Sequence, residues 1–195
     1  MTYCVSVTQG VGRMKFFLLS CAVVPVIFFG CSKIETIDIP AVKGFDIRRY
    51  CGKWYEIARL PNWFERGMSN VTASYSLRSD GTVKVVNSGW KNGKIHSTSG
   101  VARLAAASGT GELEVSFQWP FWSSYRVIRL NKDYSIAVVC GKSFDYLWIL
   151  ARKPELQADE LAAIIEFLRF RGFPVEKLEF SGNKKGSTDY DTAVK

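Results

Sequence analysis

The stretch Gly52-Lys53-Trp54-Tyr55-Glu56-Ile57-Ala58-Arg59 decides the fold of this chain. Its side chains alternate in a way that predicts a β-strand over 53–60. Because neighbouring side chains of a strand point to opposite faces, an inward Trp54 places Glu56 and Ala58 inward as well. Tyr55 and Ile57 then face outward. A carboxylate on an inner face needs a partner, so Glu56 either joins a satisfied polar cluster or selects or repels the headgroup of a ligand.

Seven further strand signals follow this stretch at short, regular intervals. The turn dipeptides Asp80-Gly81 and Asn92-Gly93 separate some of them and favour tight hairpins. After the last strand the period changes, and Leu161, Ile164, Ile165 and Leu168 predict an amphipathic helix that ends at Gly172. The seven segments are 71–77, 82–90, 94–104, 112–117, 125–130, 135–140 and 146–152. This order predicts an all-β fold: an eight-stranded antiparallel up-and-down β-barrel with one C-terminal α-helix outside, wide enough for one small ligand.

Composition excludes several classes of function. The chain has 195 residues, 47% of them hydrophobic, and a formal charge of +8 without a long basic run, which favours a globular domain over a disordered chain or a nucleic-acid-binding face. Its single histidine, His96, lies among polar neighbours and rules out sites with two or three imidazoles. No Gly-x-Ser-x-Gly or phosphate-loop motif is present. We therefore expect that the protein is not an enzyme and that it holds no cofactor and no metal ion.

The N-terminal segment has the features of a secretory signal peptide. Met14 and Lys15 precede an apolar run over 16–29 that contains Pro25 and is shorter than the roughly 20 residues that cross a bilayer. A retained membrane helix is thus the weaker reading. We expect a signal peptide over 1–30, of which 1–13 precedes the start if Met14 and not Met1 is the first residue. A tether over 31–44, a barrel-plus-helix domain over 45–181 and a polar tail over 182–195 follow.

Four motifs at matching spacing resemble the lipocalin family. They are the stretch 52–59 with its Gly-x-Trp, the segment 64–67 followed by 71–77, Asp133-Tyr134, and Arg152 at the end of the eighth strand. In addition, Cys31 after Gly30 is similar to the acylation site of bacterial lipoproteins, and Ser32 to their outer-membrane sorting signal. The closest likeness is to the outer-membrane lipoprotein group of bacterial lipocalins. The resemblance implies a diacylglyceryl anchor on Cys31 in the outer membrane, with the protein facing the periplasm.

The resemblance also implies a function and separate roles for the residues of the floor and of the interior. Gly52, Trp54 and Arg152 are expected to close the barrel floor, with Arg152 over the Trp54 ring. The barrel is expected to bind, store or transport a fatty acid or lysophospholipid and to bind no nucleic acid. Two alternatives stay open: an envelope lipoprotein with a structural or stress-related role and no ligand, and a thiol-dependent lipocalin enzyme that uses Cys140.

Alternation along the strands gives the candidate ligand contacts. Both faces are apolar in the strands predicted over 125–130, 135–140 and 146–152, so alternation does not decide which face is inward. In the last of them, Leu150 is an alternative to Tyr146 as a ligand contact. The candidates are Ala73, Tyr75, Leu77, Leu113, Val115, Phe117, Trp119, Tyr125, Tyr146 and Trp148.

Two further expectations concern the mouth and the cysteines. The segment 117–125 carries five aromatic residues around a turn at the open end. Either these rings fold over the pocket, or Trp119 and Trp122 enter a membrane interface. Cys51 and Cys140 are expected at opposite ends of the barrel, beyond the roughly 7 Å Cα separation that a disulfide allows.

Overall fold

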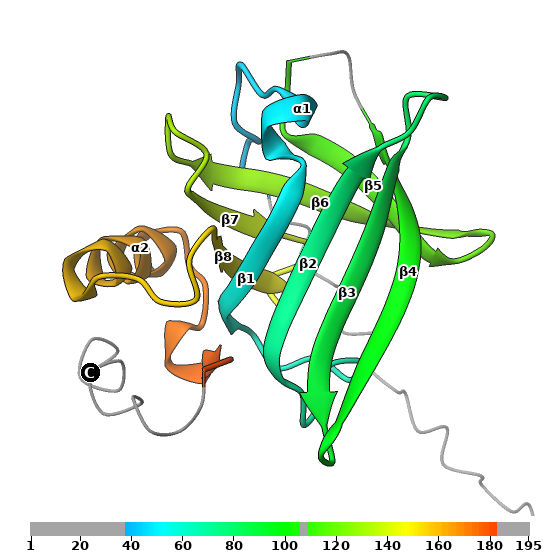
Figure 1. Ribbon diagram of the computed structural model, residues 1–195. Helices are drawn as coiled ribbons and strands as arrows, with labels where there is room; N and C mark the ends of the chain where they lie inside the picture. Colours follow the sequence, from blue (N-terminus) through cyan, green and yellow to red (C-terminus); the bar gives the residue numbers. More distant parts are fainter. Residues whose placement is uncertain (1–37, 106–108, 183–195) are drawn as a thin grey trace, which may run out of the picture. The chain divides into compact units, whose positions relative to one another are not determined.

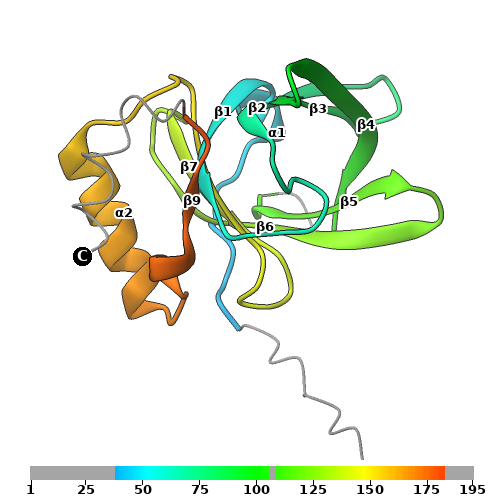
Figure 2. The ribbon, with the colours of Figure 1, turned by 90° about the horizontal axis from the view of Figure 1, so that it is seen from below.

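The computed structural model describes residues 38–105 and 109–182. Eight strands each pair antiparallel with the next, and β1 pairs with both β2 and β8, which closes the ring seen in Figure 2. The predicted up-and-down barrel is therefore confirmed. The strands are β1 (Gly52–Arg59), β2 (Ser69–Leu77), β3 (Val83–Lys91), β4 (Lys94–Leu104), β5 (Glu112–Gln118), β6 (Phe121–Leu130), β7 (Ile136–Cys140) and β8 (Leu147–Ala151).

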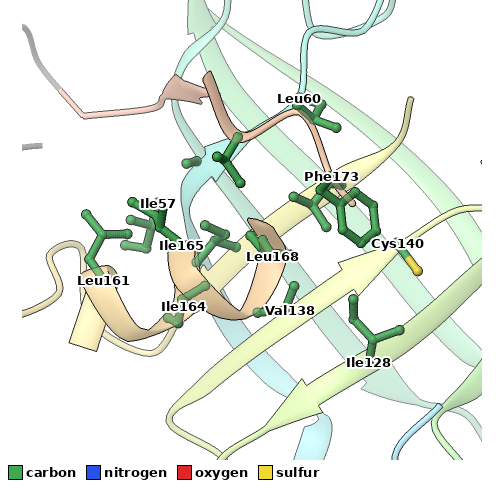
Figure 3. Packing of buried hydrophobic residues seen from close by; sticks show 14 of the residues in the cluster. Ile57, Leu60, Ile128, Val138, Cys140, Leu161, Ile164, Ile165, Leu168 and Phe173 are labelled. Carbon is green, nitrogen blue, oxygen red and sulfur yellow. The ribbon is translucent and has the colours of Figure 1, made fainter. Parts of the chain in front are cut away.

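The predicted helix is α2 (Ala158–Phe170), and it packs against the outside of β7 and β8 (Figures 1 and 3). Its four periodic apolar residues are buried. They pack in one cluster with Val138 and Cys140 of β7, which Figure 3 shows on the helix side of the strand, and with Ile149 of β8. These strands are apolar on both faces because one face lies under the helix and the other faces the barrel interior.

The barrel interior forms a second hydrophobic cluster. On β7 and β8 its members are Ala137, Val139, Leu150 and the half-buried Trp148. This settles the face that alternation alone left undecided: Leu150 and Trp148 are inward, whereas Leu147 and Ile149 lie under α2.

A single helical turn before β1 closes one end of the barrel. This turn, α1 (Ile47–Tyr50), begins at Asp46, whose side chain accepts a hydrogen bond from the Arg48 amide. Figure 1 shows α1 at one end and the β3–β4 turn at the other. We call these the closed end and the open end. Since the strands alternate in direction, the β1–β2, β3–β4, β5–β6 and β7–β8 connections all lie at the open end.

The C-terminal part of the described chain departs from the prediction. After α2, a short 3₁₀ turn η1 (Val175–Lys177) leads into a ninth strand, β9 (Glu179–Phe180). β1 pairs with β2 only up to Tyr55, and β9 takes the place beside Ala58 and Arg59 (Figure 2). A bulge at Ile57 accompanies this change of partner. It turns Ala58 into the cluster under α2, so the expectation of an inward Ala58 is wrong.

Candidate functional site

The closed end is built around Trp54 and Arg152. The Arg152 guanidinium carbon lies 3.8 Å from the centroid of the fully buried Trp54 ring, so the predicted cation–π contact is present. The same guanidinium donates hydrogen bonds to the carbonyl oxygens of Tyr50 and Cys51, at 3.1 and 2.9 Å. Arg152 therefore joins the C-terminus of α1 to the end of β8.

Gly52 has a backbone conformation at this junction that residues with a side chain rarely adopt. Its φ is +103°, and an added Cβ would lie 3.2 Å from Nη1 of Arg152. Only glycine combines this backbone conformation with so close an approach. All three residues expected at the floor thus meet there.

Three tyrosine hydroxyls meet inside the barrel above this floor. The Tyr125 hydroxyl lies 2.6 Å from that of Tyr50 and 2.9 Å from that of Tyr75. Burial raises the pKa of all three phenols, that of Tyr75 to about 12, so they stay protonated at neutral pH. Tyr75 and Tyr125 were candidates from the sequence, whereas Tyr50 was not. No pattern in the sequence indicated Tyr50, because α1 is a single turn and too short for a periodic signal.

Most of the other candidates share the interior with these tyrosines. Trp119 does not, since it is 80% exposed at the β5–β6 turn, and Leu77 is 43% exposed at the closed end, outside the buried cluster. Phe117 and Tyr146 lie near the open end, where Tyr146 stacks on Trp148 with ring centroids 6.3 Å apart. The candidates inside or packed against the interior cluster are Ala73, Tyr75, Leu113, Val115, Tyr125 and Trp148.

Exposure of the inward face increases toward the open end. Leu113 is buried near the closed end. Further along the same strand, Val115 is half-buried and Phe117 is 42% exposed. Register places Thr98 and His96 of β4 opposite Asn87 and Gly89, on the inward face, and both are exposed. Solvent therefore reaches the inward face from the open end.

Gly100 and Asn87 add detail to this inward face. A Cβ on Gly100 would lie 2.7 Å from Cδ1 of Phe117, so the missing side chain makes room for the ring of Phe117 on the inner wall. The Asn87 side-chain oxygen is buried and has no hydrogen-bond partner within the described residues. An unpaired acceptor on the inner wall is available to a ligand hydroxyl or to water.

A buried ion cluster lies where β1, β2 and β9 meet. Arg59 donates to Oε1 of Glu56 at 2.5 Å and to Oε2 of Glu179 at 3.1 Å, and its Nε lies 3.8 Å from Oε2 of Glu65. The Ser181 hydroxyl also donates to Glu56. This arrangement supports the first reading of Glu56, a satisfied polar cluster, because its carboxylate is directed to Arg59 and Ser181.

The ion cluster is connected to the mouth of the barrel through Glu65. Trp148 Nε1 donates to Oε2 of Glu65 at 3.0 Å, and the side-chain amide of Asn62 donates to the same oxygen. The loop that carries Glu65 is thereby attached to β8 and to β1. Arg59 and Glu65 both lie in the stretches quoted for the family resemblance, whereas Glu179 and Ser181, which complete the cluster, come from a segment in which the sequence predicted no strand.

Glu56 should make the stability of the protein depend on pH. Burial, followed by the charge of Glu65, raises its pKa from 4.5 to about 7 in spite of Arg59 and Ser181. A carboxyl whose pKa is raised on folding binds its proton more tightly in the native state. Stability therefore falls as pH rises from about 4.5 to 7 and levels off above it. A pKa raised from 4.5 to about 7 corresponds to a change of about 3 kcal/mol in the free energy of unfolding.

The measurement is urea unfolding of wild type and Glu56→Gln at a series of pH values. The difference between the two unfolding free energies isolates Glu56 from the other carboxyls. It should change by about 3 kcal/mol between pH 4.5 and 7.5, in favour of the variant at the higher pH. A difference that is constant across this range would show that Glu56 does not titrate there.

Cys140 does not lie inside the barrel. It is fully buried between the barrel wall and α2, beside Ile128 and Phe173 (Figure 3). Burial raises the pKa of its thiol to about 11, and a protonated thiol is a weak nucleophile. The thiol-enzyme alternative required Cys140 to face a ligand in the interior, and the structure contradicts this. Cys140 and Cys51 are both free.

Other kinds of site are not found in the part of the chain that the structure describes. Its His, Cys, Asp and Glu side chains form no group of three that could hold a metal ion. No helix within 38–105 and 109–182 combines the length and the apolar character needed to cross a bilayer. A pocket of about 360 Å³ has Tyr55, Thr72 and Ser88 among its lining residues. Because these residues face outward, this pocket lies outside the barrel.

Comparison with known proteins agrees with this geometry. The chain is 42% identical over 142 residues to the outer membrane lipoprotein Blc of Citrobacter freundii, which covers 72% of this chain and 80% of that protein. It is 39% identical over 165 residues to the Blc protein of Vibrio cholerae, over 83% and 94% of the two chains. Insecticyanin from the tobacco hornworm Manduca sexta has a similar fold, with a TM-score of 0.64 at 20% identity over 77% of this chain and 87% of its own.

A sequence model described as a lipocalin-like domain matches residues 45–183, a range that contains the floor, the interior cluster and the helix described above. The chain thus belongs to the lipocalin family.

Proposed function

We propose that this protein binds the acyl chain of a fatty acid or lysophospholipid in the barrel, and that it stores or carries this lipid in the cell envelope. The observation that supports this most is the inward face, which carries a large apolar cluster, is closed at the floor by Trp54 and Arg152, and is solvent-accessible toward the open end. An acyl chain would enter between Val115 and Trp148, with its polar head left at the mouth.

Burial of hydrocarbon supplies enough free energy for such a complex. Each methylene removed from water contributes about 0.8 kcal/mol. Ten to sixteen methylenes therefore outweigh association costs of roughly 4 to 15 kcal/mol. Two hydrogen bonds join the Tyr50, Tyr75 and Tyr125 hydroxyls, so an acyl chain beside them leaves at most one of their three O–H donors without an acceptor in this group.

We also propose that the protein is anchored in the outer membrane through Cys31. Residue 31 lies outside the described residues, so the support comes from the sequence and from relatives that carry the name outer membrane lipoprotein. Mass analysis of the N-terminal peptide from the membrane fraction should show diacylglyceryl and acyl groups on Cys31. Cys31→Ser should abolish this modification, and an unmodified peptide from the wild-type membrane fraction would contradict the proposal.

Ligand binding can be tested with a chain that begins at Ser32. This chain retains both hydrophobic clusters and every contact described here, since all lie within 38–182. Native mass spectrometry should find fatty acid or lysophospholipid bound to the purified protein. Recovery of an empty protein that also fails to bind added palmitate would favour the structural lipoprotein without a ligand.

A variant that fills the interior should remove this binding. Val115→Trp places an indole on the half-buried inner wall and should weaken palmitate binding by at least about tenfold, because it occupies the space of several methylenes. Ser99→Trp, on the exposed outer face of β4, is the matched control and should bind palmitate as wild type does. Equal binding by both variants would place the ligand outside the barrel. The comparison is made by fluorescence titration.

A further inference from the structure

Exposed apolar side chains gather at one end of this barrel. Ten large hydrophobic residues are exposed within the described ranges. Leu77, Leu104 and Phe170 lie outside the connections at the open end, and Phe117 lies on the inner wall. The remaining six surround the open end, and we call them the apolar rim: Trp63, Phe64, Trp90, Ile95, Trp119 and Phe121. They lie in or directly beside three separate connections, β1–β2, β3–β4 and β5–β6.

We propose that the apolar rim docks on the surface of a phospholipid bilayer, with the barrel opening directed at the membrane. Trp119, Trp63 and Phe121 are 80%, 76% and 70% exposed, so they contribute little to the packing of the barrel itself. Large aromatic rings at the tips of turns, which are usually polar, are typical of segments that enter a membrane interface.

The structure alters which aromatic residues take part. Trp122 is half-buried on the outer wall, where Arg103 lies 4.0 Å from its ring centroid. It is therefore not part of the rim. Phe121 takes its place beside Trp119, because β6 begins at Phe121 and the turn is limited to Trp119 and Pro120.

Charges at the open end favour an anionic lipid surface over a second protein. In the four connections and the strand residues directly next to them, Arg66, Lys94 and Lys142 are exposed and Lys91 is half-buried, whereas the one exposed carboxylate is Asp145. Cations between aromatic rings suit a membrane interface, where their charges remain among the headgroups. In the core of a protein–protein interface lysine is depleted, which argues against a second copy of the chain as the partner.

The proposed anchor allows this orientation. The described chain begins near the middle of β6, where the Ile39 carbonyl accepts a hydrogen bond from Arg126. Along the strand, Arg126 to Phe121 is roughly 17 Å. The seven chain steps from Cys31 to Asp38 extend to about 25 Å. A lipid on Cys31 and the apolar rim therefore have the reach to contact the same bilayer. If the proposed ligand function holds, a lipid would pass between bilayer and barrel without crossing water.

Flotation with vesicles tests the docking without the anchor. The chain from Ser32 is mixed with phosphatidylethanolamine–phosphatidylglycerol (3:1) vesicles and, separately, with phosphatidylcholine vesicles. Trp63→Ser, Trp119→Ser and Phe121→Ser are combined as the rim variant. Leu77→Ser and Leu104→Ser are combined as the control, because they remove exposed apolar groups at the closed ends of β2 and β4.

Wild type and the control should float with the anionic vesicles, and the rim variant should bind at least about tenfold more weakly. Binding to phosphatidylcholine should be weaker and less sensitive to salt. Circular dichroism and bound lipid, measured on all three proteins, separate loss of docking from loss of fold or of ligand binding.

Three results would overturn the proposal: a wild-type chain that stays unbound, a control that loses as much binding as the rim variant, or a rim variant that binds like wild type. If wild type sediments as a dimer and the rim variant as a monomer, with no vesicle binding by either, the rim is a contact between copies and the proposal is equally wrong.

Discussion

Replacing Trp54 with alanine should lower the free energy of unfolding by about 3–5 kcal/mol. The ring is fully buried and lies against Tyr50, with centroids 4.9 Å apart, and against the Arg152 guanidinium. Its Nε1 also donates to the Tyr50 carbonyl oxygen at 2.9 Å. The substitution leaves a cavity at the floor and removes the ring on which Arg152 rests, so α1 loses its support as well. Urea unfolding followed by circular dichroism measures the change.

The outer wall offers a matched control for this variant. Trp122 has its own guanidinium, that of Arg103, at 4.0 Å, but the pair is half-buried on the surface. Trp122→Ala should cost no more than about 1 kcal/mol, because an exposed cation–π pair is worth little and no cavity forms. If the two alanine variants lost equal stability, Trp54 would not be the main support of the floor.

Much of the fold could be predicted because its signals are local. Alternation identified all eight barrel strands, and the 3.6-residue period identified α2, because each element carries its own pattern. The floor was equally accessible. Gly52, Trp54 and Arg152 belong to a constellation that the family resemblance supplies as a unit, and the structure brings them into contact.

Features that depend on distant contacts could not be read from the sequence. β9 has two residues, too few for any periodic signal, and it forms because the parting of β1 from β2 leaves backbone groups of β1 without partners. The bulge at Ile57 follows from this change of partner and reverses the face of Ala58. The start of β6 was placed at Tyr125 because an aromatic turn resembles a loop, whereas these residues pair with β5 up to Phe121.

The ion cluster shows the same limit for the candidate site. Glu56 was expected to need a partner, which is correct, and Arg59 lies only three residues away. The sequence did not show that the bulge turns both side chains to the same side of β1, nor that Glu179 and Ser181 reach them from the C-terminal segment. Non-local pairing of this kind is specified by the closed barrel and not by the strand itself.

Arg59→Met should be as damaging as the loss of Trp54, with an expected cost of about 3–5 kcal/mol near neutral pH. Arg59 is 3% exposed and is the shared partner of Glu56, Glu65 and Glu179. Its Nη2 also donates to the Met68 carbonyl oxygen at 3.3 Å. Methionine keeps much of the side-chain volume but leaves two buried carboxylates without a cation. The loss should be smaller at low pH, since protonation removes the charge that Arg59 otherwise balances.

A double variant separates the charge from the packing. In Arg59→Met combined with Glu56→Gln, the buried negative charge at position 56 is absent. The double variant should therefore be more stable than Arg59→Met alone at pH 8. Because Glu56→Gln also changes the stability of the wild type, all four proteins are compared. The coupling free energy comes from urea midpoints of the four proteins, provided that their m-values agree. A coupling near zero at pH 8 would mean that Arg59 stabilises the junction of β1, β2 and β9 through its contacts with backbone carbonyls and not through Glu56. A large coupling that disappears below pH 5 would assign the effect to the ionised Glu56 carboxylate, in agreement with its raised pKa.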